Sequence, residues 1–311
     1  ARVALGRGAL DSRRRIVILR PASTSHAGSP PVPTLLCFGF GYSAAVLAER
    51  LLARGWTVRG TTRDPAKRAR DGVALYRFDR ATPLDPAAYD GVTHVLTSIA
   101  PDEDGDPVLD VEGERLRART AVEWVGYLGT TAVYGNRDGG WVDETAEPAP
   151  TSARGRRRVD AERAWLATGL PVHVFRLAGI YGPGRSAVDQ LRAGTARRIV
   201  KPGQVFSRIH VADIATVLEA SIARPNPGRV YNVCDDEPAP PQDVVAYAAE
   251  RLGLPVPPEL PFETAELSPM ARSFYADNRR VSNARIKDEL GVRLTCPTYR
   301  AGIDALAAAP D

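Results

Sequence analysis

The sequence predicts an α/β fold with a doubly wound parallel sheet and a smaller C-terminal part. Short apolar segments alternate with helical patterns between residues 34 and 177, the order expected of parallel strands joined by crossover helices. The first apolar segment leads through two glycines directly into a helical pattern. Beyond residue 184 the pattern changes to helices and short loops with many prolines.

The elements follow one another regularly along the first part of the chain. Six strands are predicted within residues 34–38, 55–64, 73–79, 92–99, 123–131 and 171–177. Helices are predicted directly after Ala44, at about 110–120 and at about 156–168. A late strand near 229–234 is predicted to return to the sheet, and residues 236–311 are predicted to form helices interrupted by prolines.

Right-handed crossovers place the carboxyl ends of these strands at one edge of the sheet. Ligands of such folds bind outside that edge. We therefore expect one cleft to bring together residues 39–44, Arg63, Asp79, 97–101, Thr130 and 179–184.

The turn after the first strand carries the pattern Gly39-x-Gly41-x-x-Ala44, filled in by Phe40, Tyr42 and Ser43. Gly39 permits the sharp turn, Gly41 lets the backbone approach a diphosphate, and Ala44 lets the helix lie close to the strand. The amide groups at the helix start then face the phosphates. This context predicts a Rossmann fold over residues 32–184 that binds NAD or NADP. Residues 185–311 are expected to be mainly a lid over the cleft, and the family resemblance described below implies that this part binds the substrate.

The end of the second strand bears on the choice of cofactor. An NAD site places a carboxylate about 20 residues after the glycines, whereas Thr61, Thr62 and Arg63 come first here. Hydroxyls and a guanidinium suit a 2′-phosphate, so we predict NADP. NAD stays the alternative because Asp64 follows directly.

Composition excludes several classes of function. The chain has 311 residues and a formal charge of +4, but residues 1–31 hold six arginines and one aspartate, so the remainder is nearly neutral. We therefore predict no nucleic-acid partner. No segment has the roughly 20 apolar residues of a membrane span. Three cysteines and four histidines without ligand spacing predict no metal and a cytoplasmic protein. Residues 1–31 are expected to be a disordered basic tail.

Five segments together resemble the extended short-chain dehydrogenase/reductase superfamily, especially its epimerase/dehydratase-like members. They are Gly39–Ala44, Thr130–Gly135, Arg176–Gly184, Arg208–Ile214 and Val230–Pro238. The resemblance covers residues 33 to about 308. It implies an NAD(P)-binding protein in which Asp79 contacts the adenine, and in which loops with Ser98, Ala100, Pro101 and Gly179 border the nicotinamide.

Catalysis is where the chain departs from this family. The family uses a Ser or Thr, a Tyr, and a Lys four residues after that Tyr. Thr130 stands at the first position, but Arg154 replaces the Tyr and Arg158 the Lys, and the chain contains no Tyr-x-x-x-Lys. Arg158 can keep the ribose-holding role, while Arg154 cannot exchange a proton near neutral pH. Tyr181, His210 or water would then supply the proton.

Two functions follow from this departure. The first is an atypical NADP-dependent oxidoreductase or epimerase that acts on a small carbonyl or hydroxyl compound, with Thr130, Arg158 and Tyr181 as candidate catalytic residues. The second is a catalytically silent NADP(H)-binding sensor. The expected partner is a small-molecule substrate, and the protein can form a homodimer in either case.

Overall fold

Seven parallel strands form the central sheet of the computed structural model, which describes residues 32–67 and 70–309. The sheet order is β11-β7-β5-β4-β1-β2-β3. The strands are β1 Thr34–Phe38, β2 Thr57–Thr62, β3 Val73–Arg77, β4 Val92–Thr97, β5 Trp124–Thr130, β7 Val172–Leu177 and β11 Val230–Val233. The order reverses between β1 and β4, so the predicted doubly wound parallel α/β fold is confirmed. The segment 1–31, expected to be a tail, lies outside the described residues.

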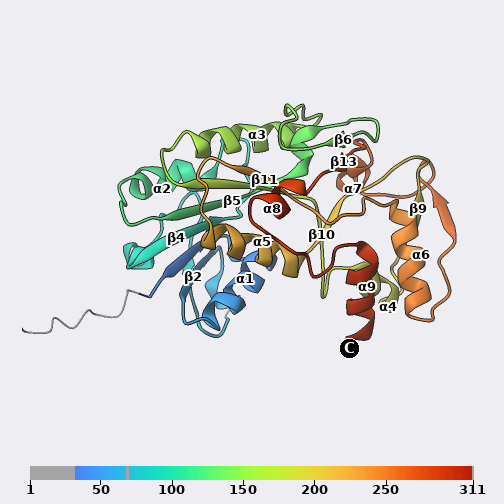
Figure 1. The fold of residues 1–311 in the computed structure, drawn as a ribbon, viewed down its shortest axis with the longest axis horizontal. Coiled ribbons are helices and arrows are strands. Elements are labelled where there is room, and N and C mark those ends of the chain that lie inside the picture. The colour runs from blue at the N-terminus through green and yellow to red at the C-terminus, as the bar shows by residue number, and fades with distance from the viewer. Residues whose placement is uncertain (1–31, 68–69, 310–311) are drawn as a thin grey trace, which may run out of the picture. The chain divides into compact units, whose positions relative to one another are not determined.

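Helices cover both faces of this sheet (Figure 1). On one face, α1 (Tyr42–Leu52) packs beside α5 (Val211–Ala223), and Leu47, Leu51 and Leu218 enter the core. On the other face lie α2 (Pro107–Arg117) and α3 (Ala153–Leu166), whose Leu116 and Trp165 are completely buried. A short 3-10 turn, Pro86–Tyr89, joins β3 to β4 where no helix was predicted.

Two helices begin earlier than the sequence pattern suggested. Helix α2 begins at Pro107 instead of near residue 110, because Asp106 accepts hydrogen bonds from the amides of Val108 and Leu109 at 3.0 and 3.1 Å. Helix α3 begins at Ala153 instead of near 156, because Ser152 Oγ accepts from the Gly155 amide at 3.1 Å. Side-chain caps of this kind fix where a helix starts, and the apolar periodicity does not report them.

The C-terminal part is built on short elements around a core of its own, which includes Leu191, Ala248 and Ile303. Its helices are α4 Ala187–Arg192, α6 Pro241–Arg251, α7 Pro269–Phe274, α8 Ala284–Asp288 and α9 Tyr299–Ala308. Three two-stranded sheets complete the described chain. They pair β10 (Arg208–His210) with β8 (Gly179–Tyr181), β12 (Glu259–Pro261) with β9 (Arg198–Val200), and β13 (Arg280–Val281) with β6 (Trp141–Val142).

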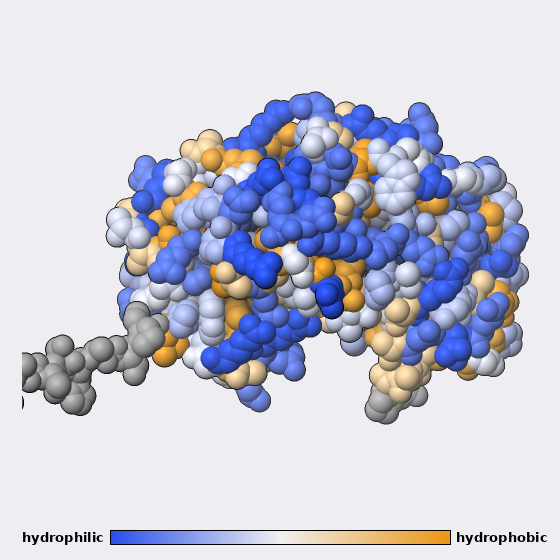
Figure 2. Space-filling view, in the orientation of Figure 1, coloured by the Kyte–Doolittle hydropathy of each residue, from blue (hydrophilic) through white to orange (hydrophobic). Residues whose placement is uncertain are grey.

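The molecular face seen in Figure 2 is largely hydrophilic, and its apolar side chains show as small separate patches. Among the helices of residues 32–67 and 70–309, none is both long and apolar enough to cross a bilayer.

Candidate functional site

A cleft of about 770 Å³ opens at the carboxyl end of the sheet. Its wall includes Gly41 after β1, Ser98 after β4, Thr130 at the end of β5 and Leu177 at the end of β7. The C-terminal part supplies the opposite wall through Phe206, Arg208, Leu267, Phe274, Tyr275, Asp277 and Arg279. The cleft therefore lies at the switch point of the sheet, where a doubly wound fold binds its ligand.

Some backbone amides of the glycine turn donate hydrogen bonds within the protein, and others have no recorded acceptor among the described residues. Gly39 N donates to Thr61 Oγ1 at 2.9 Å, Phe40 N to Thr61 O at 2.8 Å, and Gly41 N to Gly39 O at 2.8 Å. The amides of residues 42–44, the first turn of α1, have no recorded partner among the described residues, and Gly41 provides no side-chain cap. Three amide donors therefore face the cleft together with the positive end of the helix dipole.

The two glycines of the turn have different structural roles. Gly39 has φ +84°, and a Cβ there would lie 2.8 Å from Ser98 Oγ and 2.9 Å from Ile99 Cγ1. Gly41 has φ −106°, which any residue adopts, and the nearest atom to a Cβ there would be Gly39 O at 4.0 Å. Gly39 is thus required by the turn, whereas the space beside Gly41 is open to a ligand.

Thr130 ends β5 and lines the cleft half-buried. Its Oγ1 accepts a hydrogen bond from the Ala132 amide at 3.2 Å. Because this bond uses an oxygen lone pair, the hydroxyl proton stays available to a ligand.

Arg158 comes from α3 and is 7% exposed. Its Nη1 donates to Leu128 O at 3.0 Å and to Tyr127 Oη at 3.2 Å. Burial raises the pKa of Tyr127 to about 12, with Arg158 opposing the shift, so the tyrosine is a neutral partner. Arg158 is therefore a fixed, largely buried cation in the cleft wall, one helical turn from the exposed Arg154.

Tyr181 lines the cleft, but its hydroxyl does not open into it. The hydroxyl oxygen is buried without a hydrogen-bond partner among the described residues, and a Cβ at Gly302 of α9 would collide with it. Burial raises the pKa of Tyr181, and Asp235 raises it further. Tyr181 thus points away from the sheet edge and stays protonated.

His210 lies next to Tyr181, with ring centroids 5.2 Å apart. Its Nδ1 accepts from the Ala212 amide at 3.3 Å and caps α5, and burial lowers the pKa of His210. The ligand atoms of His210, Asp213 and Cys296 lie within 4.8 Å of one another. Asp213 already accepts from the amides of Thr295 at 2.7 Å and Cys296 at 2.9 Å. These bonds join α5 to the C-terminal segment, and the absence of a metal stays a prediction.

The arginine that opens the Arg176–Gly184 segment is structural. Arg176 is 6% exposed and holds Glu162 Oε2 through Nη2 at 2.8 Å and through Nε at 3.1 Å. Its Nη1 donates to Tyr134 Oη at 3.0 Å, which donates to Asn232 Oδ1 at 2.7 Å. Tyr134 therefore belongs to a buried network beneath the cleft.

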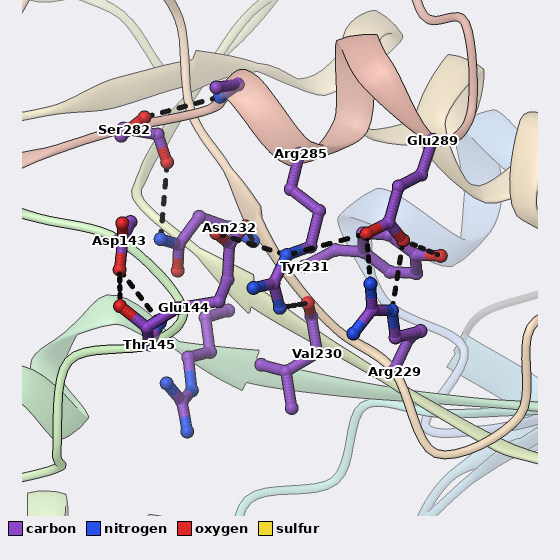
Figure 3. A network of polar contacts seen from close by, with 12 residues as sticks. Asp143, Glu144, Thr145, Arg229, Val230, Tyr231, Asn232, Ser282, Arg285 and Glu289 are labelled. Carbon is purple, nitrogen blue, oxygen red and sulfur yellow. Dashed lines mark hydrogen bonds and ion pairs between the residues drawn. The ribbon is translucent and has the colours of Figure 1, made fainter.

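The network continues to β11, the end strand of the sheet (Figure 3). Asn232 N donates to Glu144 Oε1 at 2.7 Å, and Arg285 Nη1 donates to Val230 O at 3.0 Å. One outward amide of β11, that of Asn232, and one outward carbonyl, that of Val230, are thus bonded to side chains from a loop and from α8.

The predicted site residues fall into two groups. Gly41, Tyr42, Ser43, Ala44, Ser98, Thr130, Arg158, Gly179 and Tyr181 line the cleft. Gly39, Phe40, Thr62, Arg63, Asp79, Ala100 and Pro101 do not belong to its wall. Phe40 is 6% exposed and its ring fills the space beside Gly60, so its side chain serves the core.

Sequence reasoning assigned no role to several cations of the cleft. Arg185, Arg208 and Arg279 line it together with Arg154 and Arg158. Arg279 is paired at 3.1 Å with Asp277, which is the single carboxylate among the described residues of the wall. Arg208 opens the Arg208–Ile214 segment, which carries part of the family resemblance. Its presence there was the one sequence signal that could have identified it as a residue of the cleft.

Comparisons with known proteins identify similar chains. The curated "Protein YeeZ" of Escherichia coli K12 is 30% identical over 236 residues, which cover 70% of this chain and 84% of that protein. A functionally unknown protein of Silicibacter pomeroyi has a solved structure with 59% identity and a TM-score of 0.81, covering 88% of this chain and 98% of that one. No family model matches.

A second similar structure, from Methylobacillus flagellatus, is provisionally described as an NAD-dependent epimerase/dehydratase. It is 26% identical with a TM-score of 0.68, covering 89% of this chain and 98% of that one. At 18% identity, a human epimerase family protein solved with NADPH shares the fold, with a TM-score of 0.68 and coverage of 88% and 99%.

Proposed function

We propose a function from the premise that the chain belongs to the extended short-chain dehydrogenase/reductase family, among its NAD-dependent epimerase/dehydratase-like members. The protein is proposed to be an NADP(H)-dependent oxidoreductase or epimerase that acts on a small carbonyl or hydroxyl compound. One observation carries the proposal. Three amides of α1 that have no recorded partner within residues 32–67 and 70–309 open into the same cleft as the Thr130 hydroxyl.

The residues present fit a dinucleotide. The amides of residues 42–44 would hold the diphosphate, the open space at Gly41 admits it, and the buried guanidinium of Arg158 would face the nicotinamide ribose. Such a cofactor supplies a hydride donor or acceptor. The human relative solved with NADPH supports this assignment.

The chain's own chemistry at the reacting oxygen would come from Thr130. Its hydroxyl proton is free to donate a hydrogen bond to a substrate carbonyl oxygen, because Ala132 N already occupies an acceptor site of the same oxygen. The tyrosines of the wall cannot act as bases near neutral pH. Burial raises the pKa of Tyr42, Tyr181 and Tyr275.

A titration followed by turnover tests this proposal. NADPH should bind saturably and be oxidised with at least one member of a panel of aldehydes, ketones and nucleotide sugars. The Thr130→Ala variant should lose about 100-fold or more in kcat, while its Kd for NADPH stays within about twofold. Equal kcat in the variant and the parent would remove Thr130 from the reaction.

The choice of NADP over NAD is proposed from Arg63 at the end of β2. The Arg63 side chain is exposed, and no ion pair with a described residue is recorded for it, so its guanidinium is available to a 2′-phosphate. Arg63→Glu should weaken NADPH binding by about tenfold or more and leave NADH binding unchanged. Arg63→Gln is the matched neutral control. An unaltered NADPH/NADH ratio in the glutamate variant would contradict the assignment.

A second function is favoured by a specific observation. Arg154 stands where the family has its tyrosine, and the Tyr181 hydroxyl is buried against Gly302. A redox-state sensor would bind NADPH with the same affinity and oxidise none of it in the presence of the panel. NADPH oxidation with any member of the panel would favour the enzyme over the sensor.

A further inference from the structure

Arg208 lies between two cavities of the protein. It belongs to β10 and lines the cleft together with Tyr181. It also lines a second cavity, of about 470 Å³, bordered by α4, α6 and α9. Arg185 is the other cation shared by both cavities. Arg208 is therefore placed to contact a molecule that extends from the sheet edge toward the C-terminal part.

The hydrogen bonds of Arg208 leave one edge of its guanidinium free. Nη1 donates to Phe206 O at 2.8 Å and to Ala239 O at 3.0 Å, which fixes the side chain. Nε and Nη2 have no recorded partner within residues 32–67 and 70–309. These two groups point in parallel from one side of the guanidinium, the geometry that binds a carboxylate through both oxygens.

Among the described residues, no ion pair between Arg208 and a carboxylate is recorded. Both recorded partners are neutral carbonyls, and burial lowers the pKa of Arg208, although Asp235 opposes the shift. Asp235 is the nearby acid, but burial raises its pKa to about 8, against the influence of Arg208. Its Oδ2 has no hydrogen-bond partner among the described residues. Burial thus favours the neutral form of this carboxyl, so Asp235 does not balance the charge of Arg208 as an ion pair would.

Apolar rings stand beside this cation. The Phe206 ring centroid lies 5.9 Å from Arg208 Cζ and 5.3 Å from the Tyr275 ring centroid. Phe274 and Leu267 continue the same wall. The Thr130 hydroxyl and the free amides of α1 lie in the cleft wall that the sheet supplies.

Other cations of the cleft are less suited to this task. Arg279 is already paired with Asp277. Arg154 and Arg185 are exposed, so an anion beside them would keep most of its hydration and gain little. Arg208 is half-buried, and a guanidinium there with two free, parallel donors discriminates more strongly between an anion and its neutral analogue than an exposed one does.

We propose that Arg208 binds a carboxylate of the substrate, so that the protein acts on a carbonyl or hydroxyl acid with an apolar body. The identification of this carboxylate ligand as the substrate rests on the proposed function. The carboxylate lies between the free edge of Arg208 and the Phe206–Tyr275 wall, and the reacting oxygen reaches toward Thr130.

Three small probes test this assignment without turnover. Phenylacetate carries a ring and a carboxylate, phenylacetamide is its neutral analogue, and phenyl phosphate carries a larger anion. Each is titrated by ligand-observed NMR into the protein alone and into the protein with NADPH. Phenylacetate should bind saturably and about 10- to 100-fold more tightly than phenylacetamide. Equal binding of the two, or tighter binding of phenyl phosphate, would overturn the proposal.

Variants locate the binding. Arg208→Gln should reduce phenylacetate affinity to that of phenylacetamide, and Arg208→Lys, which keeps one charge but not two parallel donors, should lie between. Arg117→Gln changes an exposed arginine of α2 outside both cavities and should bind as the parent does. Thermal unfolding of each variant establishes that it is folded. If Arg208→Gln does not fold, Arg208→Lys is used for the comparison instead. Unchanged phenylacetate binding in a folded Arg208 variant would refute the assignment.

The outcomes separate this inference from the proposed function. If NADPH binds but the Arg208 variants bind phenylacetate as the parent does, the cofactor assignment stays intact and the proposed carboxylate site is refuted. Absence of both NADPH and NADH binding removes the proposed function, whatever the probes do.

Discussion

Replacing Arg176 by leucine is expected to lower the free energy of unfolding by about 3–5 kcal/mol. The Arg176 and Glu162 side chains are 7% and 4% exposed and joined at 2.8 Å. The leucine would leave the carboxylate of Glu162 buried without its cation. Tyr134 Oη would also lose a donor, although its own bond to Asn232 remains. Chemical denaturation of the purified variant measures the loss.

The same variant should show a distinct dependence on pH. Burial raises the pKa of Glu162, and Arg176 opposes the shift, so removing Arg176 raises this pKa further. A folded-state pKa above the unfolded value means that the folded state binds more protons, so stability falls as pH rises through that interval. The deficit against the parent should therefore be smaller at pH 5 than at pH 8. A pH-independent deficit would contradict a buried, unpaired carboxylate as its cause.

A matched double variant separates charge from packing. Glu162→Met combined with Arg176→Met removes both charges and keeps similar volume, so it should recover at least half of the loss. No recovery would assign the effect to packing around Tyr134.

Replacing Gly41 by aspartate is expected to abolish dinucleotide binding while the fold keeps its stability. Gly41 already has the extended backbone of an N-cap, and a Cβ there meets no atom closer than 4.0 Å. The carboxylate would accept hydrogen bonds from the first-turn amides of α1 and cap the helix, so unfolding free energy should stay equal or rise by a few tenths of a kcal/mol. Those amides are the proposed diphosphate donors, and the added charge repels the ligand, so Kd should rise at least about 100-fold.

Calorimetric titration with NADPH and NADH, paired with thermal unfolding, measures both effects. Gly41→Asn offers the same cap without the charge, and its Kd should lie between those of the parent and the aspartate variant. Parental NADPH affinity in a folded aspartate variant would place the diphosphate elsewhere.

Local sequence signals were sufficient for the fold. The glycine turn and the alternation of strands with helices predicted the doubly wound sheet, because these patterns arise from neighbours in the chain. The starts of α2 and α3 were displaced because caps by Asp106 and Ser152 decide them. A helix cap depends on a single side chain, whereas the apolar periodicity is averaged over many residues and does not detect it.

The candidate site was predictable only in part. Gly41 and Thr130 follow strands whose ends meet at one edge, so their meeting in the cleft could be expected from topology. The direction of the Tyr181 hydroxyl depends on Gly302 in the last helix, and the free edge of Arg208 depends on carbonyls at Phe206 and Ala239. Such orientations are set by packing between segments far apart in sequence, and no local pattern reports them.

The polar contacts around β11 have a consequence for how molecules of this protein meet. An open end strand is a template on which a foreign strand can add, the step that begins ordered aggregation. Glu144 and Arg285 already hold the amide of Asn232 and the carbonyl of Val230. A strand arriving at this margin would have to displace both side chains first, which makes strand addition at β11 less favourable.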